Sequence, residues 1–180
     1  MVSMRSSGVA VLAAGIFVFA GTAHAEIDGK CGAAVGTFLT ENVLDNQGKA
    51  GTSRSLLVLT NGGHALRFDS DEQGAAMDDR PFGDSAGSWR CDGVDADGTV
   101  RLTITTLDFT FPIAEGETGQ IARIDVTGTF DPNTETMALK GKLGFLPMSA
   151  AGQKADALSQ AKTTIAVTLR GARVELPASP

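Results

Sequence analysis

The sequence predicts an all-β fold, an eight-stranded antiparallel up-and-down barrel, and three observations predict it. Eight runs of β-type composition follow one another, at 35–44, 54–60, 64–70, 87–94, 99–111, 120–130, 136–146 and 163–174. Turn-forming residues separate nearly every neighbouring pair, as in Asn61-Gly62-Gly63 and Asp95-Ala96-Asp97-Gly98. Eight sequential antiparallel strands can close on themselves and leave no free edge.

A two-layer β-sandwich is the competing architecture, because it has short strands and turns at similar spacing. The sequential order and the mostly short links favour the barrel. Glycines also lie within the runs, where they mark a bend or a close backbone approach: Gly36, Gly87, Gly128, Gly141 and Gly171.

The first 25 residues are predicted to be a signal peptide. Arg5 precedes an apolar segment over 8–20 that is short for a membrane span, and Ala23-His24-Ala25 is an A-x-A cleavage site. A retained membrane anchor is the alternative. We therefore expect one exported domain over residues 26–180, periplasmic or secreted, and not an integral membrane protein.

The charge of the chain excludes some partners. The formal net charge is −6, and it becomes −7 once Arg5 is removed. An acidic chain without a basic stripe argues against nucleic acid and anionic lipid as partners.

Two cysteines, Cys31 and Cys91, lie in the exported part of the chain. An even number of cysteines in an oxidising compartment predicts a disulfide bond, with two free buried thiols as the alternative. The bond would close a loop of about 60 residues, which the chain-entropy model values at about 4 kcal/mol.

The first three runs are assigned from their turns and their alternation. Turn residues over 45–48 end the run 35–44, and Gly51-Thr52-Ser53 is expected to continue the loop. The run 54–60 has four successive apolar residues at 56–59. The run 64–70 alternates, and we take its apolar face, Leu66 and Phe68, to be the inner one.

The stretch 71–86 is the least regular part of the chain and is predicted to be a long loop over one barrel mouth. The run 87–94 after it places Trp89 and Cys91 on the same face.

The run 99–111 contains two sets of apolar residues that follow opposite parities: Val100, Leu102 and Ile104, then Leu107, Phe109 and Phe111. This change of phase predicts a β-bulge or a sharp bend near Thr105-Thr106.

The last three runs keep one parity each. Ile124 and Val126 share a face of the run 120–130, and Leu139 lies on the apolar face of the run 136–146. Residues 152–161 are predicted to hold one short helix, with apolar positions at helical spacing, before the last run, 163–174.

Over residues 35–174 the chain resembles the lipocalin-like (calycin) barrels, specifically small exported bacterial proteins of that type. The resemblance rests on the meander of eight runs, on Gly36-Thr37-Phe38 in the place of the family's Gly-x-Trp, and on a late basic residue, Arg170 or Arg173. In that family the tryptophan closes the barrel floor and packs under such an arginine. The resemblance implies an apolar ligand inside the barrel, although the family also contains enzymes and inhibitors.

Metal and cofactor sites are not predicted. Residues 26–180 contain one histidine, His64, which lies beside a hairpin turn, whereas a transition-metal site usually needs several His or Cys ligands. Residues 69–74 begin like a calcium loop, but Arg80 stands where the bidentate Glu is required, so we interpret them as a solvated acidic loop.

No Gly-x-Ser-x-Gly elbow occurs, so a triad hydrolase is not expected. Asp108 is the one candidate general acid or base, because it interrupts an apolar stretch, and Arg123 and Asp125 could form a polar line beside it. Alternation and the cost of burying an unpaired charge favour the opposite interpretation, in which all three point to water.

The first functional hypothesis is a barrel that binds a small apolar molecule without transforming it. An eight-stranded barrel is just wide enough to be filled by side chains or to hold one small ligand. The residues expected to line or fill the interior include Leu56, Val58 and Val167, and those expected to bind the ligand are Leu66, Phe68, Trp89, Leu102, Ile104, Phe109, Ile124, Val126 and Leu139. The loop 71–86 would gate the mouth.

Two alternatives stay open. One is an inhibitor or interaction partner of an exported enzyme, although the absence of Tyr argues against the lysozyme-inhibitor type, which uses tyrosine motifs. The other is a barrel cyclase or isomerase that uses Asp108 as its general acid or base.

Overall fold

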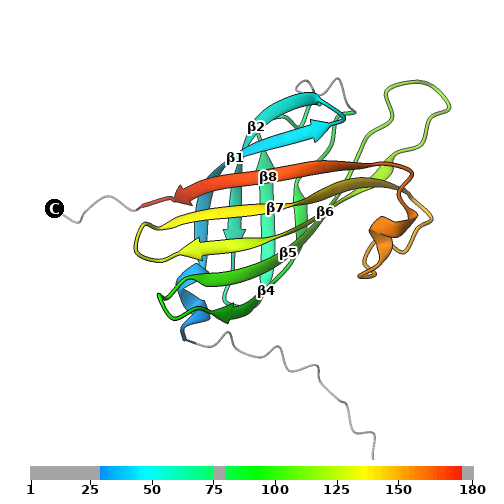
Figure 1. Ribbon diagram of the computed structural model, residues 1–180. Coiled ribbons are helices and arrows are strands. Elements are labelled where there is room, and N and C mark those ends of the chain that lie inside the picture. The colour runs from blue at the N-terminus through cyan, green and yellow to red at the C-terminus, as the bar shows by residue number, and fades with distance from the viewer. Residues whose placement is uncertain (1–28, 75–79, 176–180) are drawn as a thin grey trace, which may run out of the picture.

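The computed structural model describes residues 29–74 and 80–175, and within them eight antiparallel strands close into a barrel in the order β1 to β8 (Figure 1). The strands are β1 (Gly36–Asn46), β2 (Lys49–Leu59), β3 (His64–Asp69), β4 (Ser85–Val94), β5 (Val100–Phe109), β6 (Gln120–Asp131), β7 (Thr136–Pro147) and β8 (Thr164–Arg173). The predicted up-and-down barrel is confirmed. The predicted signal peptide lies outside the described residues.

The barrel is closed by β1 and β8, which pair antiparallel from Phe38↔Arg173 to Asp45↔Ala166. This pairing rules out the β-sandwich. Glycines allow the curvature: a Cβ added at Gly141 would overlap the carbonyl oxygen of Asp125, and one at Gly87 that of Thr105. Both positions are therefore close backbone approaches, as expected for glycine within a strand.

The hairpin between β1 and β2 is tighter than predicted. Gln47 and Gly48 both adopt positive φ, 54° and 91°, as in a two-residue hairpin turn. Residues 51–53, which were expected to continue a loop, lie in β2 and pair with β1. Their small and polar side chains concealed a strand whose inner face is itself polar.

The expected inner face of β2 and β3 is wrong. Leu56, Leu66 and Phe68 point outward and are 41%, 37% and 40% exposed, while Leu57, Leu59 and Ala65 are buried inside. Val58, also expected inside, lies between Leu57 and Leu59 on the outward parity and is only partly buried. Because four successive apolar residues present both parities, their hydropathy alone could not orient β2.

The β-bulge predicted near Thr105-Thr106 in β5 is also wrong. β5 pairs with β6 in unbroken register from Val100↔Phe130 to Phe109↔Ile121, and the register shift lies in β4 between Cys91 and Gly93. The inner face of β5 instead turns polar, with Thr106 and Asp108 buried, and Phe109 is 56% exposed. The apolar side chains thus move from the inner to the outer face along β5, while the strand itself stays regular.

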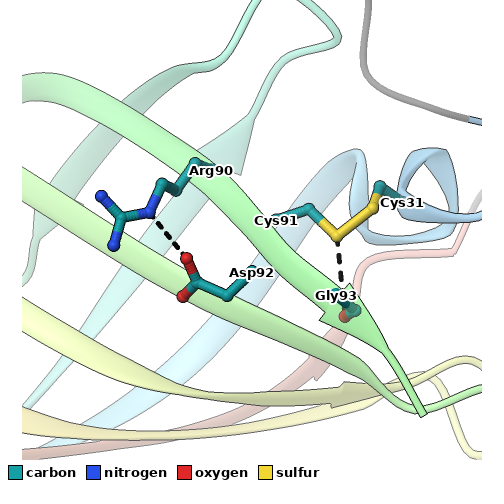
Figure 2. The surroundings of a disulfide bond; sticks show 5 residues. All are labelled: Cys31, Arg90, Cys91, Asp92 and Gly93. Atoms are coloured by element: carbon teal, nitrogen blue, oxygen red, sulfur yellow. Dashed lines mark hydrogen bonds and ion pairs between the residues drawn. A yellow bond between two sulfur atoms is a disulfide. The ribbon is translucent and has the colours of Figure 1, made fainter.

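One end of the barrel is closed. The short 3-10 helix η1 (Cys31–Ala34) lies beside β4 and β5 at this end, where the rings of Phe38 and Phe130 make an edge contact at 5.4 Å (Figure 1). The predicted disulfide is confirmed: Cys31 and Cys91 join η1 to β4, with their Cα atoms 5.9 Å apart (Figure 2).

The connection between β7 and β8 folds back against the outside of the barrel (Figure 1). It contains a four-residue 3-10 helix, η3 (Ala157–Gln160), within the stretch where one short helix was predicted. The side chains of Leu158 and Ala161 lie over Gly144 of β7.

Candidate functional site

The barrel interior has two chemically different halves. Toward the closed end the inner face is apolar and fully buried, with Phe38, Leu57, Leu59, Val100, Leu102, Phe130 and Leu139. Toward the open end it stays apolar on β6 and β7, whereas on β1 to β5 it carries the buried polar residues Thr40, Asn42, Ser53, Ser55, Arg67, Asp69, Ser85 and Asp108. A buried polar set of this kind needs internal partners.

Hydrogen bonds join the polar side chains of β1, β2 and β3. Asn42 Nδ2 donates to Ser53 Oγ and to Asp69 Oδ2, both at 3.0 Å. Thr40 Oγ1 and Ser55 Oγ lie 2.8 Å apart, and Ser55 Oγ donates to Asn42 Oδ1. The network fixes three neighbouring strands and the carboxylate of Asp69.

Arg67 and Asp69 form a buried ion pair on the inner face of β3. Arg67 Nη2 donates to Asp69 Oδ2, and Arg67 Nε donates to Ser55 Oγ at 3.3 Å. Asp69 Oδ1 accepts the backbone N–H of Asp71 at 2.9 Å. Both Asp69 oxygens are thus occupied, and the pair is neutral as a unit.

Asp108 lies across the interior on β5, and its carboxyl group has fewer hydrogen-bond partners than that of Asp69. Its Oδ2 accepts a hydrogen bond from Ser85 Oγ at 2.9 Å, whereas its buried Oδ1 has no partner. The side chain is only 3% exposed. Burial raises its pKa to about 6, against the opposing effects of the Ser85 hydrogen bond and the charge of Arg67.

A cavity of about 50 Å³ opens beside these groups at the mouth of the barrel. Its polar lining includes Ser53, Arg67, Asp69 and Asp108, and its apolar lining Leu44, Phe82, Ala122, Ile124, Leu143 and Phe145. A volume of this size holds about three or four water molecules, whereas whole drug-sized ligands occupy roughly 300 Å³ or more. The enclosed part therefore fits a head group, and the remainder of a ligand would lie at the rim.

The rim on the β3–β4 side is acidic. Asp71 and Arg80 line the cavity, and Arg80 Nη2 lies 3.2 Å from Glu117 Oε2. A hydrogen bond with Asp84 raises the pKa of Glu72, and burial and the negative charge of Asp84 act in the same direction.

The residues predicted to bind a ligand are brought together only in part, and not around the cavity. Ile124 lines the cavity. Trp89, Leu102, Ile104, Val126 and Leu139 are packed within the core, while Leu66, Phe68 and Phe109 are exposed on the outside. Whether any of them contacts a ligand stays a prediction.

Asp108 was expected to point to water, and that expectation is wrong. Arg123 was expected to point to water with it, and Arg123 is also buried, although on the outer face. Its Nη1 donates to the carbonyl oxygens of Gly152 and Lys154, both at 2.6 Å, and its Nε donates to Asp125. The segment before η3 covers Arg123, so Arg123 and Asp125 form no line beside Asp108.

Sequence reasoning missed the polar half of the interior. Arg67 and Asp69 were placed outside because their neighbours Leu66 and Phe68 are apolar. Thr40, Asn42, Ser53, Ser55, Arg67 and Asp69 share the parity of the buried positions in three successive strands, but that parity becomes visible only from the register and burial of the folded strands.

Within residues 29–74 and 80–175, no three His, Cys, Asp or Glu side chains gather as ligands for a metal ion. None of the helices in these ranges has the length and hydropathy needed to cross a bilayer. No protein-family model, no curated protein and no solved structure matches the sequence.

Proposed function

We propose that the protein binds a small, largely apolar molecule through one polar head group, at the open end of the barrel, without transforming it. The observation that supports this best is Asp108 Oδ1, a buried acceptor without a partner beside a cavity whose other walls are mostly apolar. A few polar groups in an apolar pocket are how small-molecule sites usually obtain orientation and specificity.

We also propose that the chain is a lipocalin-like barrel that works outside the cytoplasm. The closed eight-stranded meander is compatible with that fold, and Arg173 lies over the ring of Phe38 at the closed end, as the resemblance implies. The disulfide between Cys31 and Cys91 supports export, because such bonds persist in oxidising compartments.

Native mass spectrometry tests the binding function. The protein is purified gently from the periplasm, and its intact mass is measured before and after denaturation. An adduct of small mass that leaves on denaturation is expected. A bare mass, with no binding of added amphipathic molecules, would contradict the proposal and direct the search to protein partners.

A cavity-filling variant makes the test specific to this site. Ala122 is buried on β6 and lies directly opposite Asp108, so Ala122→Phe should fill the cavity and remove the adduct. Ala138→Phe is the matched control, because Ala138 is exposed on the neighbouring strand. If both variants keep the adduct, the molecule binds elsewhere.

The pKa of Asp108 supports a second candidate, a cyclase or isomerase. A carboxyl group with a pKa of about 6 in an apolar cavity can exchange protons near neutral pH. In this case Asp108→Asn keeps binding but abolishes turnover of the bound compound. If the compound recovered from the protein is unchanged after long incubation with wild type, the catalytic candidate fails.

A further inference from the structure

We infer that the head group bound at the mouth is a cation with N–H donors, a primary or secondary ammonium group on an apolar body. This inference rests on the proposed binding function and specifies the chemical class of its ligand.

The charges around the cavity favour a cation. Asp69, Asp71 and Asp108 line it, together with two bases, Arg67 and Arg80. Arg67 is neutralised by Asp69, and Arg80 by Glu117 outside the cavity. Asp108 therefore stands against no remaining base in the lining, and its part of the cavity is negative.

The neighbours of Asp108 show where a donor is missing. β3 contributes Arg67 and Asp69, whose charges cancel, and β4 contributes only the hydroxyl of Ser85. On β6 its direct cross-strand partner is Ala122, which has neither charge nor hydrogen-bonding side chain. No described group donates to Asp108 Oδ1, so a ligand N–H would complete its hydrogen bonding.

An ammonium group complements Asp108 Oδ1 better than the other common head groups. Its charge offsets the cost of burying the Asp108 carboxylate, and its N–H donors form charge-assisted hydrogen bonds. A carboxylate head would meet the buried carboxylate of Asp108 and be repelled. A hydroxyl could donate one hydrogen bond but would leave the negative charge uncompensated. A quaternary ammonium has the charge but lacks the N–H.

Isothermal titration calorimetry with four six-carbon probes separates these cases: hexylammonium, hexanol, hexanoate and hexyltrimethylammonium. At pH 7.5 we expect hexylammonium to bind at least tenfold more tightly than hexanol and hexyltrimethylammonium, and hexanoate more weakly than either. At pH 5, below the raised pKa of Asp108, hexylammonium should bind about tenfold more weakly, because about one tenth of the carboxyl groups stay ionised.

Asp108→Asn is the decisive variant. It should weaken hexylammonium at least tenfold and leave hexanol within about twofold. Glu41→Gln is the matched control, since it removes one carboxylate from the exposed outer face of β1 and should leave all four affinities unchanged. Near-ultraviolet circular dichroism of Trp89 reports whether each variant is folded.

The outcomes are distinguishable. If hexanol binds as tightly as hexylammonium, or if Asp108→Asn leaves hexylammonium binding unchanged, the ammonium class is wrong and the binding function stands. If no probe binds and native mass spectrometry finds no adduct, both proposals are overturned.

Discussion

The guanidinium of Arg173 lies over the ring of Phe38, with Cζ 5.0 Å from the ring centroid and 5.1 Å from that of Phe130. Arg173 also donates to the backbone carbonyls of Val35 and Ala33 through Nη1 and Nη2. A residue at the end of the last strand thus holds the start of the first. Gly36 makes room for it, because a Cβ at Gly36 would overlap Arg173 Nη1.

Arg173→Ala should therefore destabilise the closed end. It leaves two carbonyl groups without their donor and removes the cation–π contacts, so we expect a loss of about 2–4 kcal/mol in the free energy of unfolding. Arg170→Ala is the control, because Arg170 is exposed on the same strand and should cost no more than about 0.5 kcal/mol. Urea unfolding measures both. Equal losses of unfolding free energy in the two variants would show that the contact of Arg173 with the two rings does not stabilise the fold specifically.

The adjacent residues Leu56 and Leu57 provide a direct test of which face of β2 is inside. Leu57→Ala should cost about 2–5 kcal/mol because Leu57 is 1% exposed, and Leu56→Ala less than about 1 kcal/mol because Leu56 is 41% exposed. Chemical denaturation of the two variants measures the difference. A larger loss for Leu56→Ala would mean that the register of β2 is shifted by one residue.

Removing the disulfide should destabilise the fold without opening the barrel. The bond spans 60 residues, and the Cys31→Ser/Cys91→Ser double variant should lose about 4 kcal/mol in the chain-entropy model. Thermal unfolding with and without reductant measures the loss of stability in wild type. The reductant should have no effect on the double variant, because that variant has no disulfide to reduce. A thiol-reactive reagent should label no thiol in the folded, oxidised wild type; labelling of two would contradict the bond.

The raised pKa of Asp108 predicts an unusual pH dependence. The folded state holds a proton on Asp108 that the unfolded state has lost between its ordinary pKa of 3.8 and about 6. The contribution of Asp108 to stability therefore falls as pH rises through this window, by up to about 3 kcal/mol.

Asp108→Asn removes this titration while keeping an acceptor for Ser85. The variant should be more stable than wild type at pH 7.5, and their difference in unfolding free energy should shrink between pH 6 and pH 4. Urea unfolding across this range measures it. A difference that does not vary with pH would show that Asp108 titrates normally in the folded protein.

The outer faces of β1, β2 and β3 show which structural features the hydropathy pattern could predict and which it could not. Leu39, Leu56 and Phe68 form one exposed cross-strand row, while Asn42, Ser53 and Asp69 lie inside. The hydropathy pattern therefore predicted that these segments are strands, but it exchanged the inner and outer faces of β2 and β3. In β6 and β7, where Ile124, Val126 and Leu139 are buried, the same reasoning gave the correct inner face.

The sequence by itself determined the number and order of the strands, most of their turns and the pairing of Cys31 with Cys91, because local turn chemistry, alternation and a count of two cysteines are readable along the chain. Only the tertiary structure decided that Arg67, Asp69 and Asp108 lie inside. Their burial depends on partners from other strands, such as Asn42, Ser55 and Ser85. Hydrogen bonds from neighbouring strands stabilise a charged side chain inside the barrel. Closure of the barrel brings these hydrogen-bonding partners together.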